Sequence, residues 1–243
     1  MRALLTPRWM IAHVVVLVIS VVFVSLGMWQ LRRLDERRLA NTVGESRFEA
    51  EPVDATLLVS AAGSDFDSLN DRRALATGVF VPESEVLIRS QVYRGVAGFH
   101  VITPLLTEDG SAVLVNRGWV PLEMDQVPVI AAPPPTGEVT VEGWLAPTQE
   151  RRAPGPRDPE DGRLVALNRV DIERIQDQVS LPLSAVYLVA MGEWEAELPI
   201  PVDPPTFDDE GPHLAYAVQW FSFLAIGLVG YGFLIRKSLP SSG

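Results

Sequence analysis

The stretch that decides the fold is MIAHVVVLVISVVFVSLGM, residues 10–28. Its 19 residues carry no formal charge, and a helix of that length crosses about 30 Å of hydrocarbon. A second apolar run, LAYAVQWFSFLAIGLVGYGFLI at residues 214–235, places Tyr216, Trp220 and Tyr231 toward its ends, where amphipathic rings favour the lipid headgroups. The two runs predict two transmembrane helices that enclose a large middle domain.

Two other interpretations of the first run fit less well. A buried core helix normally keeps a polar stripe toward water, and residues 10–28 have none. A cleaved signal peptide has a shorter apolar region and a small-residue cleavage site, whereas this run continues into WQLRRLDERR, residues 29–38. An uncleaved anchor is the better interpretation. Because too few residues precede it for an organelle-import peptide, a bacterial inner membrane is favoured.

Charge is distributed unevenly along the chain. All 31 acidic residues lie between the two apolar runs with 16 of the 20 basic ones, so the middle carries a net charge of −15. The remaining four basic residues flank the outer ends of the runs, where the positive-inside rule predicts cytoplasmic tails: Arg2, Arg8, Arg236 and Lys237. An equal cluster follows the first run, at Arg32, Arg33, Arg37 and Arg38. Because long domains translocate largely regardless of charge, we expect the middle to lie outside the cytoplasm.

Composition excludes several classes of function. The chain has no cysteine, which removes thiolate catalysis, zinc–thiolate sites, iron–sulfur ligation and thiol relay to a metal. The acidic middle makes nucleic acid an unsuitable partner. No hydrolytic triad, calcium loop or glycine-rich phosphate cradle is present in the sequence. The acidic run at residues 208–210 predicts a solvated loop, and the arginine cluster is expected to meet lipid phosphates.

The middle of the chain is typical of antiparallel β structure. Short β-rich runs bounded by turn residues occupy 76–81, 85–93, 98–106, 111–120, 138–146 and 184–191. Residues 108–110 predict a hairpin turn in which Gly110 supplies a positive φ, and 171–179 predict a short helix with Asp171 as its N-cap. The Pro-rich stretch 147–162 is expected to be a mobile loop. The first helix is expected to continue past the bilayer and break around residues 41–44.

The predicted fold class is therefore a membrane α+β protein. Two transmembrane helices, N-terminal and C-terminal, flank a mainly antiparallel β extracytoplasmic domain with short helices. The predicted segments are a cytoplasmic tail at 1–9, a span at 10–29, an extracytoplasmic domain at 30–212, a second span at 213–235 and a cytoplasmic tail at 236–243.

Of the three histidines, His213 is the strongest candidate ligand. It stands at the mouth of the second span, with Tyr216 and Trp220 on the same helical face at i+3 and i+7, where a flat apolar macrocycle would fit. Trp29 and Gln30 stand at the matching depth of the first span. The alternative is that these rings only anchor the helix at the interface. His100 favours a structural role, and His13, inside the first span, is open to either interpretation.

Four stretches together resemble the Surfeit locus protein 1 family. They are GMWQLRRL at 27–34, GFHVITPLLTEDGSAVLVNRGWVP at 98–121, VEGWL at 141–145 and HLAYAVQWF at 213–221. Their order and the two-span architecture also match, and the resemblance, of a bacterial, actinobacterial type, covers essentially the whole chain. Family members often carry Asn before the histidine of the second span, whereas this chain has Pro212.

The resemblance implies an assembly factor for haem–copper cytochrome c oxidase in the bacterial cell membrane, and not an enzyme. It implies haem a as a transient cofactor, with His213 as the ligand of its iron and Tyr216, Trp220, Trp29 and Gln30 around it. The expected partners are oxidase subunit I, the haem a synthesis machinery and the lipid bilayer. Asn116, Arg117, Gly118 and Trp119 are candidates for partner binding, although residues alone indicate only a turn and a packing Trp. The alternative function is a membrane scaffold that stabilises an oxidase assembly intermediate and binds no cofactor.

Overall fold

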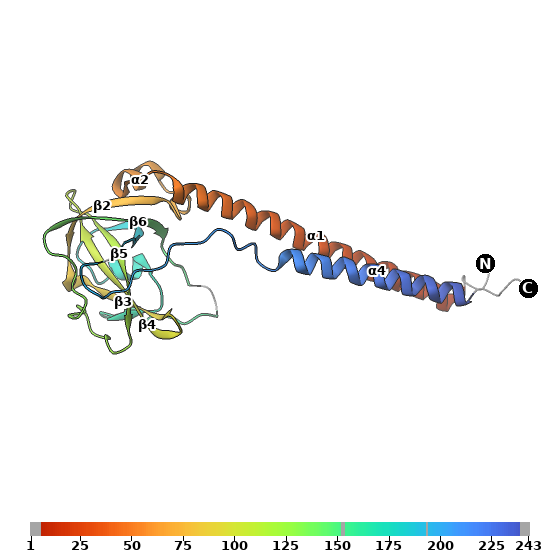
Figure 1. Ribbon diagram of the computed structural model, residues 1–243. Helices are drawn as coiled ribbons and strands as arrows, with labels where there is room; N and C mark the ends of the chain where they lie inside the picture. Colours follow the sequence, from red (N-terminus) through yellow and green to blue (C-terminus); the bar gives the residue numbers. More distant parts are fainter. Residues whose placement is uncertain (1–5, 152–153, 193, 239–243) are drawn as a thin grey trace, which may run out of the picture. The chain divides into compact units, whose positions relative to one another are not determined.

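The computed structural model describes residues 6–151, 154–192 and 194–238, and Figure 1 shows its elements. The described residues divide into two compact units. One unit contains the residues up to Val43 and those from Phe207 onward, and the other is Gly44–Thr206. The first consists mainly of two long helices and the second of a sheet with short helices, which confirms the predicted fold class.

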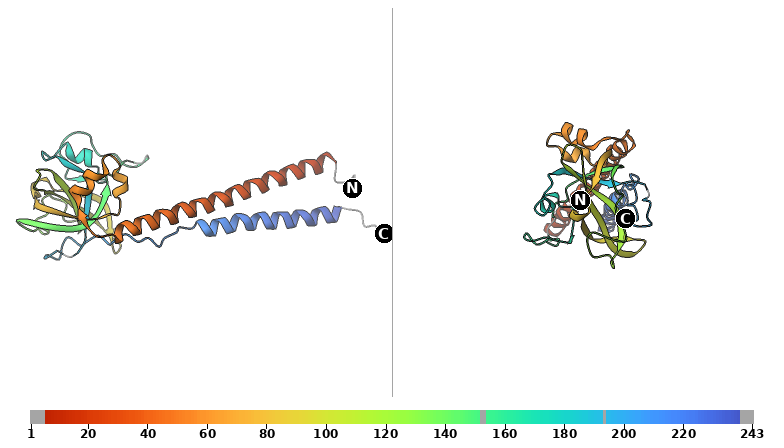
Figure 2. Two further views of the ribbon diagram at one scale, coloured as in Figure 1. Left: turned by 90° about the horizontal axis from the view of Figure 1, so that it is seen from above. Right: turned by 90° about the vertical axis from the view of Figure 1, so that its left-hand side faces the viewer.

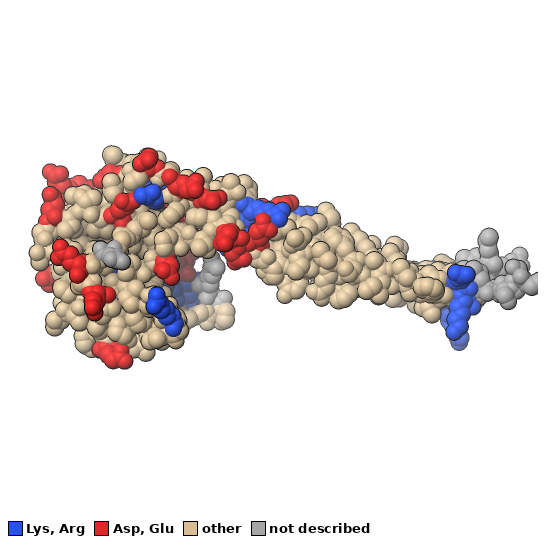
Figure 3. All heavy atoms as spheres, in the orientation of Figure 1, with Lys and Arg blue, Asp and Glu red and all other residues tan. Residues whose placement is uncertain are grey.

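Two helices are long and apolar enough to cross a membrane: α1 (Pro7–Glu49) and α4 (His213–Ser238). Almost none of either apolar stretch is buried, whereas the core helix of a soluble protein would be mostly covered. Figure 3 shows, on the face in view, a stretch of this surface without charged side chains. The prediction of two membrane helices is confirmed in length, composition and exposure.

The first helix runs further than predicted. Its 43 residues correspond to about 64 Å, roughly twice the hydrocarbon thickness, and it does not break at residues 41–44. Asn41 and Gly44 are both buried, and the Asn41 side-chain amide donates to the carbonyl oxygen of Asp209 at 3.0 Å. These contacts offset the low helix propensity of Asn and Gly, which was the reason to expect a break.

The two helices lie side by side and antiparallel, as Figures 1 and 2 show. Gly27 of α1 packs directly on Phe221 of α4: a Cβ atom at Gly27 would lie 2.6 Å from the Phe221 ring. Leu34 and Ala217 are buried along the same seam. Such small residues allow helix backbones to approach closely in a membrane, where van der Waals packing drives association.

The β unit is a mixed sheet of eight strands: β1 (Val53–Asp54), β2 (Arg73–Phe80), β3 (Val86–Tyr93), β4 (Val96–Leu106), β5 (Ala112–Pro121), β6 (Glu138–Pro147), β7 (Ala166–Leu167) and β8 (Leu183–Ala190). Their order is β1-β2-β6-β8-β5-β4-β3-β7. An additional antiparallel pairing of β2 with β4 closes the sheet on itself. All six predicted strands are confirmed, but β5–β8, β1–β2 and β3–β7 pair in parallel. Because β5 lies between β4 and β8, almost all of it is buried.

Short helices complete the β unit. Asp171 caps α3 (Ile172–Gln176) as predicted, since its carboxylate accepts from the amide of Arg174, although this helix is shorter than expected. Gly110 has a φ of 84°, which confirms the hairpin turn. The helix α2 (Ala55–Ala62) and the 3₁₀ turns η2 (Phe66–Leu69) and η3 (Pro82–Ser84) were not predicted. Asp54 caps α2 through the amides of its first turn.

The Pro-rich loop 147–162 is held in place over part of its length. Asp158 accepts from the backbone and side-chain amides of Asn168, and the Arg174 guanidinium donates to the carbonyl oxygens of Pro159 and Gly162. Residues 152–153, within the stretch expected to be mobile, lie outside the described residues.

A β-bulge interrupts β5 at Arg117. Gly118 pairs with Val101 and Asn116 pairs with Ile102, so Arg117 is the extra residue on its strand. A bulge re-aims the side chain of the inserted residue. Here it directs a guanidinium into the interior, where Arg117 is only 1% exposed.

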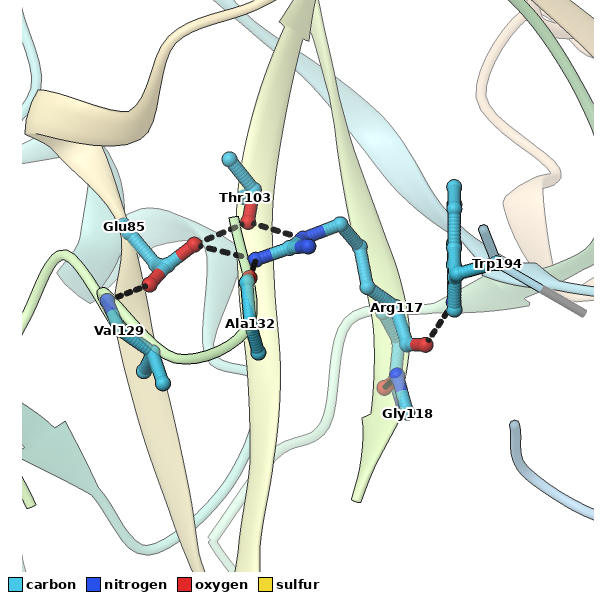
Figure 4. Close-up of polar contacts among 8 residues, drawn as sticks. Glu85, Thr103, Arg117, Gly118, Val129, Ala132 and Trp194 are labelled. Carbon is cyan, nitrogen blue, oxygen red and sulfur yellow. Dashed lines mark hydrogen bonds and ion pairs between the residues drawn. The ribbon is translucent and has the colours of Figure 1, made fainter. Parts of the chain in front are cut away.

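Arg117 forms a fully buried ion pair with Glu85, shown in Figure 4. The guanidinium Nη2 lies 2.9 Å from Glu85 Oε2 and also donates to the carbonyl oxygen of Ala132 at 2.8 Å. The Thr103 hydroxyl accepts a hydrogen bond from Arg117 Nε and donates one to Glu85 Oε2. The amide of Val129 donates a hydrogen bond to the other carboxylate oxygen of Glu85. The network ties β3, β4 and β5 to the loop around residues 129–132. Burial lowers the pKa of Arg117, and the Glu85 charge partly offsets this effect.

Residues next to the bulge are also held by internal contacts. Asn116 accepts from the amide of Gly118 through its side-chain oxygen. A Cβ atom at Gly118, whose φ is 125°, would lie 2.1 Å from the carbonyl oxygen of Ile200. The Trp119 backbone pairs with that of Ile200 in both directions, and the Trp119 ring packs against Tyr93 with centroids 5.6 Å apart.

His100 is the one histidine of the β unit, and its surroundings favour the neutral form of the imidazole. Its Nδ1 lies 3.1 Å from the side-chain amide nitrogen of Asn116, so it accepts a hydrogen bond. Burial lowers the pKa of His100 to about 4. A histidine held neutral by burial supports the structural interpretation of this residue.

Removal of Arg117 should be severely destabilising. We expect Arg117→Leu to lower the free energy of unfolding by about 3–5 kcal/mol, because Glu85 would remain buried without its counter-ion. Tryptophan fluorescence during chemical denaturation of the full chain in detergent measures this loss. The double variant Glu85→Leu with Arg117→Leu is the control, and should lose less than the sum of the two single variants. Wild-type stability of Arg117→Leu would contradict the structural role of the pair.

Stability should also depend on pH through His100. Unfolded histidine titrates near its ordinary pKa of about 6.5, so between pH 6.5 and 4 the unfolded chain binds more protons than the folded one. The free energy of unfolding therefore falls as pH decreases through this window. We expect the difference between wild type and His100→Gln to change by about 2 kcal/mol from pH 7 to pH 5, because the variant lacks this titration. Parallel stability–pH curves for the two proteins would show that His100 is not responsible.

Candidate functional site

The candidate site is where α4 begins, which we call the His213 end of the helix pair. Pro212 directly precedes the helix, and its carbonyl oxygen accepts from the amide of Tyr216 at 3.1 Å. A proline lacks an amide hydrogen, but the residues at a helix start have no intrahelical acceptor for theirs. Pro212, at the position where the resemblance implies Asn, is therefore compatible with a helix that begins at His213.

His213 contacts the other helix through its ring. Its Nδ1 lies 2.8 Å from Oε1 of Gln30, a side chain that is 8% exposed. With an amide oxygen as acceptor, Nδ1 carries the proton and Nε2 keeps its lone pair. A histidine that ligates a metal usually donates its other ring N–H to an oxygen in this way, which fixes the tautomer and the orientation of the ring.

Gly211 lies beside the opposite edge of the imidazole. A Cβ atom at Gly211 would lie 3.6 Å from Nε2 and 3.4 Å from Cδ2 of His213, which is ordinary van der Waals contact. The residue has a φ of 67°, which a larger side chain would adopt only with strain. The backbone conformation therefore favours glycine at this position, next to the ring of His213.

Aromatic side chains lie along both helices at this end. Trp220 packs against Phe23 and Phe223, with ring centroids 5.7 and 6.0 Å away. Trp29 and Tyr216 are about half exposed on the outside of the helix pair. Of the five predicted cofactor residues, the structure thus joins His213 to Gln30, places Trp220 in an aromatic cluster and leaves Trp29 and Tyr216 on the surface.

A set of polar contacts that we call the strap links α1 to the residues before α4. Arg38 pairs with Glu210 through two hydrogen bonds of 2.7 and 2.9 Å, and Arg37 Nε donates to the carbonyl oxygen of Asp209 at 3.1 Å. Asn41 donates to the same carbonyl, and the amide of Gly211 donates to the Asp209 carboxylate. The hydrogen bond from Arg38 lowers the pKa of Glu210, and the same contact raises the pKa of Arg38.

The strap changes one prediction and adds to another. Arg37 and Arg38 were expected to meet lipid phosphates, but they bind Asp209 and Glu210. The acidic run 208–210 is a largely exposed loop, as predicted, and it is also anchored to α1. The signal was present in the sequence, since a basic cluster follows one span and an acidic run precedes the other. Only antiparallel packing brings these two charged segments together.

Asn116, Arg117, Gly118 and Trp119, the predicted partner-binding residues, are all buried in the β unit. Each has an internal contact that accounts for its identity. Asn116 bonds to His100, and Arg117 pairs with Glu85. Gly118 allows a close approach of the backbone at Ile200, and Trp119 packs against Tyr93. That they bind a partner stays a prediction, and their side chains would reach one only after a rearrangement.

A cleft in the β unit is lined by other residues. It has a volume of about 780 Å³ and mixed charge, with Asp65, Asp67, Glu150, Arg151 and Arg169 in its lining. Within the described ranges, no group of three or more His, Asp or Glu side chains is arranged to hold a metal ion. His213 is therefore the best-built candidate for a ligand in the part of the chain that the structure describes.

Comparison with known proteins identifies the family. The chain is 29% identical to an uncharacterized SURF1-like protein of Mycobacterium bovis over 95% of its length and 84% of the relative's. It is 25% identical to a SURF1-like protein of Rickettsia felis, over 94% and 98%, and 29% identical to one of Monosiga brevicollis, over 93% and 88%. The model of the SURF1 family matches residues 17–225, which include the whole β unit and the parts of α1 and α4 next to it in the chain. This chain therefore belongs to the SURF1 family.

Proposed function

We propose that this protein handles haem a during the assembly of cytochrome c oxidase, with His213 as the ligand of the haem iron. The SURF1 family is associated with cytochrome c oxidase assembly, and its members are assembly factors and not known enzymes. Haem a handling, the ligand and the partners are the parts that we propose for this chain.

The contact between His213 Nδ1 and Gln30 is the observation that carries the proposal. It favours the tautomer in which Nε2 is the donor atom, and Gly211 lies beside the Nε2 edge. Neutral imidazole is a common ligand of haem iron. The donor atom and the fixed orientation of the ring therefore support a role as an axial ligand.

The surroundings also suit a flat apolar macrocycle. Haem a, when bound, would supply an iron that accepts the imidazole and a hydrophobic tail suited to lipid. Trp29 and Tyr216 expose ring surface near the start of α4 and next to Gln30 in the chain, and Trp220 with Phe23 and Phe223 extends the aromatic surface along the helices. The strap holds the residues before His213 against α1, which limits movement of the imidazole away from Gln30.

Partners and location follow from the same proposal. A carrier of haem a has to meet the machinery that makes haem a and oxidase subunit I, which receives it. We infer that the protein lies in the bacterial cell membrane with both tails in the cytoplasm and the β unit outside. The basic residues at the tail ends of the helices support this orientation.

Haem binding is tested by the absorbance spectrum of the protein purified from cells that make haem a. We expect a haem spectrum in the wild type and its loss in His213→Ala. Gln30→Leu should weaken haem binding by about 10- to 100-fold, because the imidazole loses the oxygen that orients it. His13→Ala, at the other end of the helix pair, is the matched control and should retain the haem. A His213→Ala protein with an unchanged haem spectrum would exclude this ligand.

A cofactor-free scaffold for an oxidase assembly intermediate is the second candidate function. The internal contacts of Asn116, Arg117, Gly118 and Trp119 would serve it indirectly, because they make this part of the sheet a rigid support for a docking surface. Normal oxidase assembly by His213→Ala, together with failure when the 115–119 segment of β5 is disrupted, would favour the scaffold over haem handling. If oxidase assembly fails in His213→Ala but proceeds when residues 115–119 are repacked, haem handling is favoured over the scaffold.

Orientation is tested with reporters inserted in the loop 147–162. Alkaline phosphatase, which is active only outside the cytoplasm, should be active there because we place the β unit on that side. A reporter that is active only in the cytoplasm should be inactive at the same position. The reverse pattern would place the β unit in the cytoplasm and overturn the orientation.

A further inference from the structure

The opposite end of the helix pair, which we call the Tyr231 end, contains a second cross-helix cluster. The hydroxyl of Tyr231 on α4 forms a hydrogen bond with Nδ1 of His13 on α1. The Trp9 ring lies against both, with centroids 6.0 Å from His13 and 6.4 Å from Tyr231. This contact pins the beginning of α1 to the last turns of α4.

The two cross-helix contacts are separated by one membrane thickness. His13 and Gln30 are 17 residues apart on α1, and His213 and Tyr231 are 18 residues apart on α4. At about 1.5 Å per residue, each separation is about 26 Å, close to the thickness of the hydrocarbon. If the His213 end lies at one face of the bilayer, the Tyr231 end lies at the level of the headgroups on the other.

Positive charge gathers at the Tyr231 end without acidic compensation from the helices. Arg8 precedes Trp9, and Arg236 and Lys237 lie in the last turn of α4. Neither residues 1–28 nor residues 215–243 contain an Asp or Glu. At the His213 end, by contrast, the arginines are paired with Asp209 and Glu210. The exposed cations of the Tyr231 end are therefore open to an anion from outside the helix pair.

We propose that the Tyr231 end is a binding site for the phosphate headgroup of an anionic phospholipid, built jointly by α1 and α4. Arg8, Arg236 and Lys237 supply the positive charge, and Trp9 and Tyr231 are rings of the kind that sit at headgroup depth. The pin between His13 and Tyr231 brings cations of two different helices together. A lipid bound there would in turn hold the ends of the helices against each other.

The test uses the full chain, delipidated in detergent and titrated with phosphatidylglycerol or phosphatidylcholine, with bound lipid counted by native mass spectrometry. We expect tighter binding of phosphatidylglycerol. The double variant Arg8→Gln with Arg236→Gln should lose about 25-fold in affinity, since each cation near a lipid surface contributes about a five-fold factor. Tyr231→Phe should also weaken binding, although it removes no charge, because it breaks the pin.

The matched control is Arg32→Gln with Arg33→Gln, which removes two arginines from the other end of the apolar stretch of α1 and should leave phosphatidylglycerol affinity unchanged. An equal loss in this control would mean unspecific attraction, and would overturn the site. Competition by millimolar inorganic phosphate as effective as that of the lipid would mean a free-anion site instead. Wild-type lipid affinity in the Arg8 and Arg236 double variant would also refute the proposal. Circular dichroism of each variant verifies that the helices remain folded.

Discussion

Gly27 packs against the ring of Phe221 with no room for a side chain between them, and the arrangement of the helix pair depends on this contact. Because the backbones approach closely there, Gln30 lies one turn further along α1 within reach of His213. The strap follows two to three turns later. In hydrocarbon there is no hydrophobic force between helices, so such close packing has to hold them together with a few polar contacts.

Those polar contacts are confined to the two ends of the apolar stretch. At one end an imidazole of α4 bonds to an amide of α1, and at the other a phenol of α4 bonds to an imidazole of α1. Contacts at both ends also oppose sliding of one helix along the other. The ends differ in charge, since acidic residues compensate the arginines only at the His213 end. This difference is why one end suits a neutral cofactor ligand and the other an anionic lipid.

In the β unit, a single inserted residue explains a distinctive stretch of sequence. The bulge at Arg117 turns a guanidinium inward, and the interior accepts that charge because Glu85, Thr103 and a carbonyl oxygen surround it. Gly118 is required by the backbone of Ile200, and Asn116 by its contacts with Gly118 and His100. In this fold, the residues of this motif therefore hold neighbouring strands and loops together.

The sequence by itself determined the two membrane helices, the six longer strands, the hairpin turn at Gly110 and the cap at Asp171. Each depends on local properties: uninterrupted apolar length, alternation of side chains, positive φ and the hydrogen bond of a capping side chain. His213 and Gln30 were identified as candidates, but not their contact. Three features could not be predicted. The parallel pairing of β5 with β8 and the ion pair of Arg38 with Glu210 join residues that are far apart in the chain. The continuation of the α1 helix through Gly44 depends on the packing around that residue. Only the tertiary structure decided them, because no local pattern specifies which distant surface a helix or strand will meet.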